Sequence, residues 1–263
     1  MTSTPMRTVL EEDKHWWFAS RTRAILAYLD RHLRPARGLR ILDVGCGAGN
    51  MAHHLRHYGA VTGVDNNPKP LEIAAERGLD VRTGTADALP FGDGEFDLIA
   101  LLDTIEHVPA EAKVLEECRR VLAGPAGDPA GGKGEGGRLL ITVPAFMFLW
   151  SHNDVINMHQ RRYTAGELRT KLESHGFRVL AISYNNFFVF PLAALLILLR
   201  RGRAEPELAS PHFDQEAYQV EMEPAPLLMN AFLTFVGKVE VALLRRVSLP
   251  FGTSIIAIAE KRS

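Results

Sequence analysis

From Leu39 onward the chain alternates short apolar runs with segments of helical periodicity, and this alternation most constrains the fold. Such alternation is typical of a parallel sheet covered by helices on both faces. We predict helices at 50–58, 68–77, 110–122 and 164–175, the last with Thr164 as N-cap and Glu167 completing a capping box. The fold class is therefore α/β, with a doubly wound, mainly parallel sheet. Seven strands are expected, at Arg40–Val44, Val61–Asp65, Val81–Thr83, Phe96–Leu102, Arg138–Val143, Phe177–Ser183 and Ser254–Ala259.

The regular alternation divides the chain into four parts. Residues 1–38 are predicted to form an N-terminal helical cap, 39–183 the core, 184–250 a helical insertion and 251–263 the final core strand. Within the core, seven of the fourteen residues of 124–137 are glycine, which predicts a mobile surface loop.

The insertion contains an apolar run, Phe187–Leu199, closed by Arg200, Arg201 and Arg203. An acidic linker and a second helix at about 226–246 follow, so we expect a helical hairpin. The run of thirteen residues would span about 20 Å, short of the roughly 20 residues that cross a bilayer. Two interpretations remain for 187–203: burial in a lid or homodimer interface, or contact with an anionic membrane surface.

Composition limits the class of partner. The chain has 263 residues, of which 46% are apolar and 23% charged, as in ordinary globular proteins. A net charge of −1 gives no general attraction for phosphates, so no nucleic acid partner is expected. Two cysteines and an N-terminal segment without an apolar signal core favour a cytoplasmic protein, peripheral to the inner face of the membrane if 187–203 binds lipid.

The strongest local signal is the first predicted strand, which runs into a turn containing Gly45, Gly47 and Gly49. Glycine permits backbone conformations closed to other residues and lets a ligand approach the main chain, so the turn predicts a nucleotide-like ligand. A dinucleotide fingerprint would place its third glycine where Asn50 stands. The spacing therefore disfavours NAD, although an NAD-dependent oxidoreductase stays an alternative.

This turn resembles the first motif of class I S-adenosylmethionine-dependent methyltransferases, an acidic residue two positions before Gly-x-Gly-x-Gly. Asp43, Gly45, Gly47 and Gly49 match that motif. The resemblance implies a Rossmann-like fold and S-adenosylmethionine as cofactor. It also implies that the turn cradles the amino acid part of the cofactor, with Asp43 near the α-ammonium.

Further matches follow in register, and the resemblance covers about Arg40 to Val143. Asp65, followed by Asn66, ends the second strand, where a carboxylate can accept hydrogen bonds from ribose hydroxyls. Ala86 and Asp87 resemble the segment that contacts adenine. Because ligands lie at the carboxyl ends of parallel strands, we expect Leu102, Asp103 and His107 to face the cofactor or the acceptor.

Two flanking segments resemble a small-molecule subgroup of these methyltransferases. In the first, residues 15–21, the tryptophans are expected to pack in the core, and Arg21 could reach a carboxylate of the cofactor or of Asp103. The second, residues 150–164, follows the fifth strand and is the predicted acceptor site.

The predicted acceptor segment supplies candidate catalytic groups. His152 or His159 could remove a proton from the acceptor, with Asp154 orienting an imidazole. Acceptor contacts are expected from Trp150, Arg162 and Tyr163, together with His107. Alternatively, His159 and Arg162 only tie the loop to the sheet. The spacing of these residues matches no strong metal signature, so no metal is predicted.

The sequence thus predicts transfer of a methyl group from S-adenosylmethionine to a small-molecule or lipid-linked acceptor, at oxygen rather than nitrogen. The alternative that is not an enzyme is a membrane-associated binding protein with the same fold.

Overall fold

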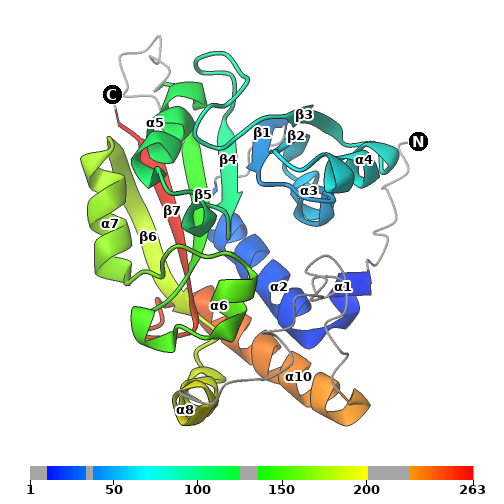
Figure 1. Cartoon of the computed structure of the whole chain (residues 1–263), viewed down its shortest axis with the longest axis vertical. Coiled ribbons are helices and arrows are strands. Elements are labelled where there is room, and N and C mark those ends of the chain that lie inside the picture. Colours follow the sequence, from blue (N-terminus) through cyan, green and yellow to red (C-terminus); the bar gives the residue numbers. More distant parts are fainter. Residues whose placement is uncertain (1–10, 34–37, 125–135, 201–225, 263) are drawn as a thin grey trace.

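The computed structural model describes residues 11–33, 38–124, 136–200 and 226–262. Its centre is a seven-stranded sheet with the order β3-β2-β1-β4-β5-β7-β6 (Figure 1). The pairs among β1 to β5 are parallel, whereas β7 lies antiparallel between β5 and β6. The mainly parallel, doubly wound sheet of the sequence analysis is confirmed. Its strands are β1 (Leu39–Val44), β2 (Gly59–Asp65), β3 (Asp80–Thr83), β4 (Leu98–Leu102), β5 (Arg138–Pro144), β6 (Phe177–Asn185) and β7 (Ser254–Lys261).

The helices form two layers around the sheet. α2, α3 and α4 pack on one face, while α5 and α7 pack on the other. Thr164 caps α7 through the predicted capping box with Glu167. The helical elements of the core are α1 (Glu11–Lys14), α2 (Trp16–His32), α3 (Asn50–Leu55), α4 (Pro68–Glu76), η1 (Ile105–His107), α5 (Glu111–Val121), η2 (Met147–Leu149), α6 (His152–Ile156) and α7 (Ala165–Ser174).

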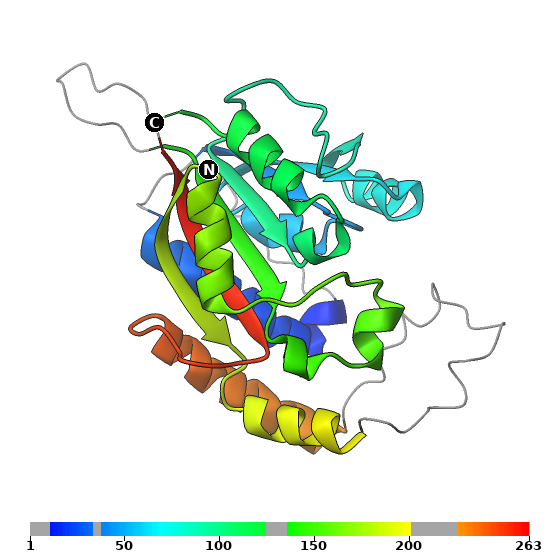
Figure 2. The same ribbon diagram turned by 60° about the vertical axis from the view of Figure 1, so that its left-hand side comes forward.

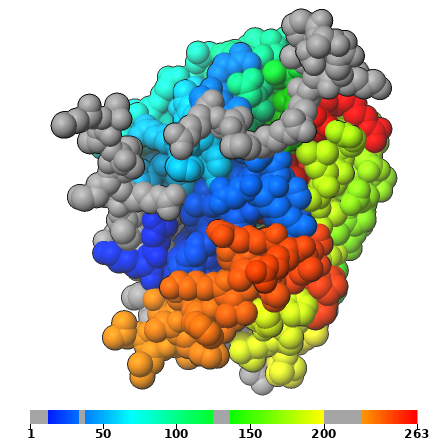
Figure 3. Space-filling model, turned by 180° about the vertical axis from the view of Figure 1, so that it is seen from behind, coloured from blue at the N-terminus to red at the C-terminus, as the bar shows by residue number. Residues whose placement is uncertain are grey.

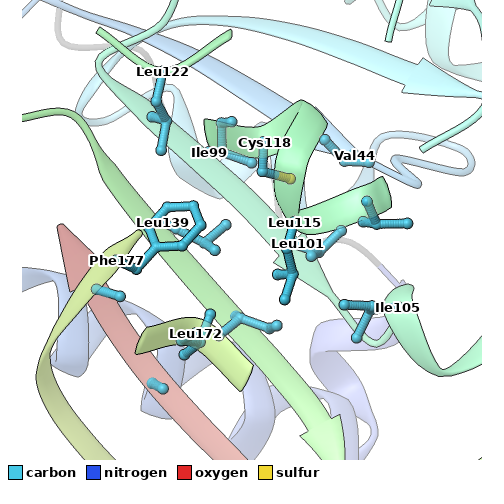
Figure 4. Packing of buried hydrophobic residues seen from close by; sticks show 14 of the residues in the cluster. Val44, Ile99, Leu101, Ile105, Leu115, Cys118, Leu122, Leu139, Leu172 and Phe177 are labelled. Atoms are coloured by element: carbon cyan, nitrogen blue, oxygen red, sulfur yellow. The ribbon is translucent and has the colours of Figure 1, made fainter. Parts of the chain in front are cut away.

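The central strand β4 shows why the two layers form. Leu98, Ala100 and Leu102 point to the face covered by α2 and α3, whereas Ile99 and Leu101 point to α5 and α7. Figure 4 shows the second of these clusters, in which Leu101 and Leu139 of the sheet meet side chains of α5 and α7. Since successive side chains of a strand alternate between faces, a strand apolar at every position must be covered on both sides.

Predicted and observed elements differ mainly at their ends. The fourth strand begins at Leu98 instead of Phe96, because Phe96 makes only an isolated bridge to Leu122. The third helix ends at Leu55, three residues earlier than predicted, in a turn before β2. Most of the predicted glycine-rich loop, residues 125–135, lies outside the described residues.

The N-terminal helix is a layer of the core and not only a cap. Ile25, Tyr28 and Leu29 of α2 are almost completely buried against the sheet and α3. The predicted cap segment therefore also contributes a helix to the core. Only the first turns of α2 approach the carboxyl ends of the strands.

The insertion supplies two apolar helices, α8 (Phe190–Arg200) and α10 (Leu227–Leu244), at one end of the molecule (Figure 2). The predicted linker between them, 201–225, lies outside the described residues. α10 runs along the outer side of α2, as Figure 3 shows from behind. Among the described residues, α10 is the one helix whose length and composition would allow it to cross a bilayer.

Specific contacts hold one side of α10 against the domain. Asn230 accepts a hydrogen bond from the Trp16 backbone at 2.8 Å, and Arg31 donates to the Leu244 carbonyl at 2.9 Å. The buried carboxylate of Glu240 accepts from the backbone N–H groups of Asn186 and Phe188. These bonds place α10 along the surface of the domain.

Gly237 makes the close approach of α10 to α2 possible, and this can be tested. A Cβ at Gly237 would lie 2.1 Å from Ser20 Oγ and 2.9 Å from Ser20 Cβ. Gly237→Ala should therefore lower the free energy of unfolding by about 1–3 kcal/mol, the usual cost of overpacking. Gly166→Ala on α7, where a Cβ meets nothing within 4 Å, is the matched control and should raise stability by about 0.5–1 kcal/mol. Urea titrations of the three proteins measure this; equal effects of the two substitutions would contradict the close packing.

Candidate active site

The glycine turn after β1 has the geometry of a ligand cradle. Gly45, Gly47 and Gly49 all have positive φ angles, of 74°, 50° and 77°. A Cβ at Gly45 would lie 2.6 Å from Thr104 Oγ1, so glycine is also required there for space. The Gly47 N–H donates to Asp65 Oδ2 at 2.9 Å, which joins the turn to the end of β2. Backbone N–H groups and a carboxylate thus meet at the carboxyl edge of the sheet.

Asp43 lies beneath this turn as a buried carboxylate. Its side chain is 3% exposed, and Oδ2 has no hydrogen-bond partner among the described residues. Burial raises the pKa of Asp43 to about 7, against the opposing effect of Arg21. A cationic group beside it would favour the ionised form, which is what the α-ammonium of S-adenosylmethionine supplies.

A cavity of about 260 Å³ opens beside the turn. Of the predicted site residues, Gly45, Asp65, Asn66, Ala86, Asp103 and His107 line it. Six predicted contacts are not among the lining residues: Asp43, Gly47, Gly49, Asp87, Leu102 and Arg21. Leu102 is buried, so its side chain has a packing role. Six further residues line the cavity, each within two positions of a predicted residue along the chain: Val44, Val64, Gly84, Thr85, Thr104 and Val108.

Arg21 reaches across the cavity edge to Asp103. Its Nε donates to Asp103 Oδ2 at 2.7 Å, which is one of the two alternatives left open by the sequence. Asp103 has a φ of 50°, a region that non-glycine residues seldom adopt, and its N–H donates to the Thr142 carbonyl at 3.0 Å. A strained residue at the end of β4 is typical of functional sites. The pair fixes the start of α2 next to the cavity.

The loop between β5 and α7 brings His159 to the same edge. The Gln160 N–H donates to the Glu106 carbonyl at 2.8 Å, and Arg161 pairs with Glu111 at 3.1 Å. His159 consequently lies against His107, with ring centroids 4.7 Å apart. Residues separated by more than fifty positions in the chain meet beside the cavity.

Asp154 contacts His159, one of the two histidines that the sequence left open. Asp154 Oδ1 lies 2.9 Å from His159 Nδ1, and its two oxygens also accept from Nε and Nη2 of Arg162 at 2.7 and 2.9 Å. Burial opposes ionisation, but the hydrogen bonds from His159 and Arg162 prevail and lower the pKa of Asp154 to about 2. An ionised carboxylate only accepts hydrogen bonds, so Nδ1 of His159 donates the hydrogen bond to Asp154 and Nε2 is the other ring nitrogen.

The remaining predicted acceptor residues have other places. His152 is exposed at the start of α6 and does not join the His159–Asp154 pair. Tyr163 is 2% exposed and its hydroxyl donates to Glu111, so it packs in the core instead of facing an acceptor. Arg162 ties the loop through Asp154, which is the alternative role given above, and Trp150 is half-buried after η2. Of the predicted acceptor residues, His107 and His159 lie together beside the cavity.

Glu106 is the functional candidate that sequence reasoning missed. It is completely buried between His107 and the end of β4. Burial, and then the charge of Asp103, raise the pKa of Glu106 well above its usual range. An acidic residue directly before His107, after the predicted fourth strand, was the available signal.

Comparison with known proteins bears on this site. Residues 42–125 match the family described as "Methyltransferase domain". A "Ubiquinone biosynthesis O-methyltransferase" of Cereibacter sphaeroides is 36% identical over 111 residues, or 38% of this chain and 45% of that protein. One of Azorhizobium caulinodans is 40% identical over 85 residues, or 30% of this chain and 34% of that protein. The chain thus spans less than half the length of these relatives.

The fold also matches over nearly the whole chain. An S-adenosylmethionine dependent methyltransferase from Mesorhizobium loti covers 94% of this chain and 100% of its own, with a TM-score of 0.58 and 15% identity. The [4+2]-cyclase SpnF covers 94% and 82%, with a TM-score of 0.57 and 20% identity. Residues 42–125 are thus similar to a methyltransferase domain, and this match supports S-adenosylmethionine as the cofactor. The chain has the Rossmann-like fold that the sequence predicted.

The position of Asp43 in the methyltransferase domain predicts a pH-dependent cofactor affinity. Folding and burial raise the pKa of Asp43 to about 7, so the cofactor-free domain takes up a proton below that pH. Because the α-ammonium favours the ionised form, affinity for S-adenosylmethionine should be highest above pH 7. It should fall by up to about tenfold for each pH unit below. Isothermal titration between pH 5.5 and 8 measures this dependence.

Two controls assign the effect to Asp43. Asp43→Asn removes the titrating group and should flatten the profile. 5′-Methylthioadenosine lacks the amino acid part of the cofactor, so its affinity should not change with pH. Parallel profiles for both ligands would show that another group titrates.

Proposed function

We propose that this protein transfers the methyl group of S-adenosylmethionine to a hydroxyl oxygen of a small or lipid-linked acceptor. The observation that carries the proposal is the His159–Asp154 pair, which the fold brings to the edge of the cofactor cavity beside His107. An oriented imidazole is a group that hydroxyl chemistry requires.

The cofactor side of the reaction rests on the glycine turn. The turn from Gly45 to Gly49 would hold the amino acid part of the cofactor, Asp43 its ammonium, and Asp65 its ribose. When bound, the cofactor supplies an electrophilic methyl group on a sulfonium. Displacement at that carbon needs the acceptor in line, and orientation of this kind contributes roughly 7–11 kcal/mol in favourable cases. The residues that position the acceptor are therefore as important as the residue that takes up its proton.

The acceptor side favours oxygen over nitrogen. A neutral amine attacks with a free electron pair, whereas a hydroxyl must lose its proton as the new bond forms. Asp154 occupies Nδ1 of His159 and leaves Nε2 to interact with the acceptor. The curated relatives named above are O-methyltransferases, which supports the same choice and a lipid-linked acceptor.

Two other functions are opposed by specific observations. An NAD-dependent oxidoreductase conflicts with Asn50 in the glycine turn and with the methyltransferase match of residues 42–125. A binding protein would retain the fold without acceptor chemistry, and the fold does occur in a [4+2]-cyclase. A buried aspartate that orients a histidine beside the cavity is costly to maintain without a reaction, and it favours the enzyme.

Replacement of His159 tests the proposal. His159→Ala should lower the rate of methyl transfer about a hundredfold or more, because the acceptor hydroxyl then loses its activating group. The dissociation constant of S-adenosylmethionine should stay the same, since His159 does not line the cofactor cavity. The assay follows tritiated methyl transfer to a panel of phenols, sugars and carboxylic acids, with and without alkyl chains.

Matched amines provide the control. Transfer to an amine analogue should be slow in the unchanged enzyme and should depend little on His159. Near-normal transfer to hydroxyl acceptors by His159→Ala would leave His159 with a purely structural role.

We further propose that the end of the molecule formed by α8 and α10 rests on an anionic membrane surface. Apolar side chains are exposed along both helices: Leu199 is 64%, Phe232 63% and Leu228 85% exposed. The exposed side chains of Met147 and Phe148 on η2 extend this surface towards the acceptor loop, and Phe148 contacts Phe190. A lipid-linked acceptor could then pass from the bilayer to His159 without crossing water.

The shape of this end supports a position on the surface of the bilayer. Asn230 holds α10 to the start of α2, and Glu240 holds it to the segment after β6. Exposed Lys238, Arg245 and Arg246 accompany the apolar residues of α10. Cations beside an exposed apolar face suit anionic headgroups. Such a protein would be cytoplasmic and peripheral to the membrane.

Flotation with liposomes tests this surface. Leu195 and Phe232 are exposed, whereas Phe190 packs against Phe251 at 5.2 Å and would report on folding as well. Leu195→Asp with Phe232→Asp should abolish flotation with vesicles containing anionic lipid. Ile73→Asp, which replaces an exposed apolar residue on α4, should not. Retained flotation of the double variant would contradict membrane contact. A change from dimer to monomer in the double variant, with no flotation of either protein, would assign the surface to a homodimer.

A further inference from the structure

The charges at the acceptor edge, the border of the cavity where His107 and His159 meet, limit which acceptors can approach it. Three described segments border this edge: the first turns of α2, η1 and the loop 145–164. They contain four arginines, whose side chains are always charged. An acceptor that carries a carboxylate or a phosphate would need one of these arginines as its partner.

Three of the four arginines are turned away from an acceptor. Arg21 donates from Nε to Asp103 Oδ2 at 2.7 Å, and Arg161 pairs with Glu111 of α5 at 3.1 Å. Neither guanidinium can bind an acceptor without giving up an internal ion pair. Arg23 follows two positions after Arg21, and this spacing places it on the opposite side of α2.

The fourth arginine and His159 share one carboxylate. Both oxygens of Asp154 accept hydrogen bonds from Arg162, and Oδ1 also lies 2.9 Å from His159 Nδ1. A positive charge on either side chain is therefore balanced within the loop. Burial lowers the pKa of His107, so its ring is uncharged at neutral pH. The edge thus presents hydrogen-bonding groups to an acceptor, while its cations are already paired.

The buried carboxyl group of Glu106 shows that this edge disfavours negative charge. Glu106 is 0% exposed, and its oxygens have no hydrogen-bond partner within the part of the chain that the structure describes. Burial and the charge of Asp103 raise the pKa of Glu106 well above its usual range. A carboxylate or phosphate of an acceptor would enter the same surroundings, where an unpaired anion is costly.

The outer rim of the acceptor loop is apolar. Four of its apolar side chains are between 44% and 60% exposed: Met147, Phe148, Val155 and Met158. The side-chain amides of Asn157 and Gln160 donate to carbonyl groups of the same loop. A sugar would need polar partners at this rim, whereas hydrocarbon groups of an acceptor would bury apolar surface against it. The rim therefore favours an acceptor with hydrocarbon substituents.

We propose that the acceptor is a phenol with hydrocarbon substituents and no charged group, and that the Arg21–Asp103 pair excludes anionic hydroxy compounds. This inference rests on the proposed function and selects phenols from the panel of phenols, sugars and carboxylic acids. In the transfer, the phenol oxygen bonds to the methyl carbon while the sulfur–methyl bond breaks. The phenol proton passes to Nε2 of His159 and from there to solvent water.

Binding of matched phenols tests the charge preference without relying on activity. The probes are 3-(4-hydroxyphenyl)propionate, its amide, which has the same shape without the charge, and 4-propylphenol. Isothermal titration of the full chain loaded with S-adenosylhomocysteine, at neutral pH, gives the dissociation constants. We expect the amide to bind at least about tenfold more tightly than the carboxylate, because the carboxylate finds no free cation. 4-Propylphenol should bind more tightly than the amide, because its chain matches the apolar rim.

Three variants assign the preference to the ion pair at the edge. Asp103→Asn releases Arg21 and should improve binding of the carboxylate relative to the amide at least about tenfold. Asp103→Asn combined with Arg21→Gln removes both charges and should restore the preference of the unchanged protein. Asp97→Asn is the matched control, since it releases Arg40 from an ion pair at the opposite end of the sheet. This control should leave the ratio of the two dissociation constants unchanged.

The outcomes separate this inference from the proposed function. Equal or tighter binding of the carboxylate by the unchanged protein overturns the inference, as does an unchanged ratio in Asp103→Asn or no binding of any probe. Circular dichroism and titration with S-adenosylmethionine show that each variant is folded. Methyl transfer to the carboxylate probe as fast as to the amide also overturns the inference but leaves the proposed function standing. Probe binding as expected, without methyl transfer to any hydroxyl, counts against the proposed function alone.

Discussion

The buried carboxylate of Asp154 is the interaction on which the acceptor side of this protein depends. It receives hydrogen bonds from Ser151, His159 and Arg162 at once, and so it closes a loop that would otherwise extend into solvent. Because both arginine bonds and the histidine bond go to one carboxylate, the position of His159 is determined within the fold before any acceptor binds. The orientation of His159 Nε2 and its proximity to His107 follow from this arrangement.

Buried carboxyl groups without hydrogen-bond partners are places where a ligand would bind. At the carboxyl edge of the sheet, Asp103 and Asp154 have arginine partners, whereas Asp43 and Glu106 have buried oxygens without partners among the described residues. The cost of burying an unpaired carboxylate is reduced when a cation arrives. The ammonium of the cofactor would relieve this cost at Asp43.

The apolar end of the molecule adds a second level of organisation. α10 packs on α2, and the start of α2 carries Arg21, which pairs with Asp103 beside the cavity. The proposed membrane surface and the cofactor cavity are thus connected through one rigid helix. A protein that takes its acceptor from a bilayer needs this geometry, since the acceptor loop must stay at a fixed height above the lipid.

The sequence by itself determined the strands, the helices, the glycine turn and the cofactor class. These features depend on local periodicity and on glycine conformations, which neighbouring residues impose. It also placed Asp154 near His152 and His159, because all three lie on one loop. Tertiary structure alone decided that α2 is a core layer, that Tyr163 is buried, and that Glu106 meets His107 and His159. Those outcomes require the carboxyl ends of β4 and β5 to lie side by side, and this proximity arises from strand pairing between distant segments.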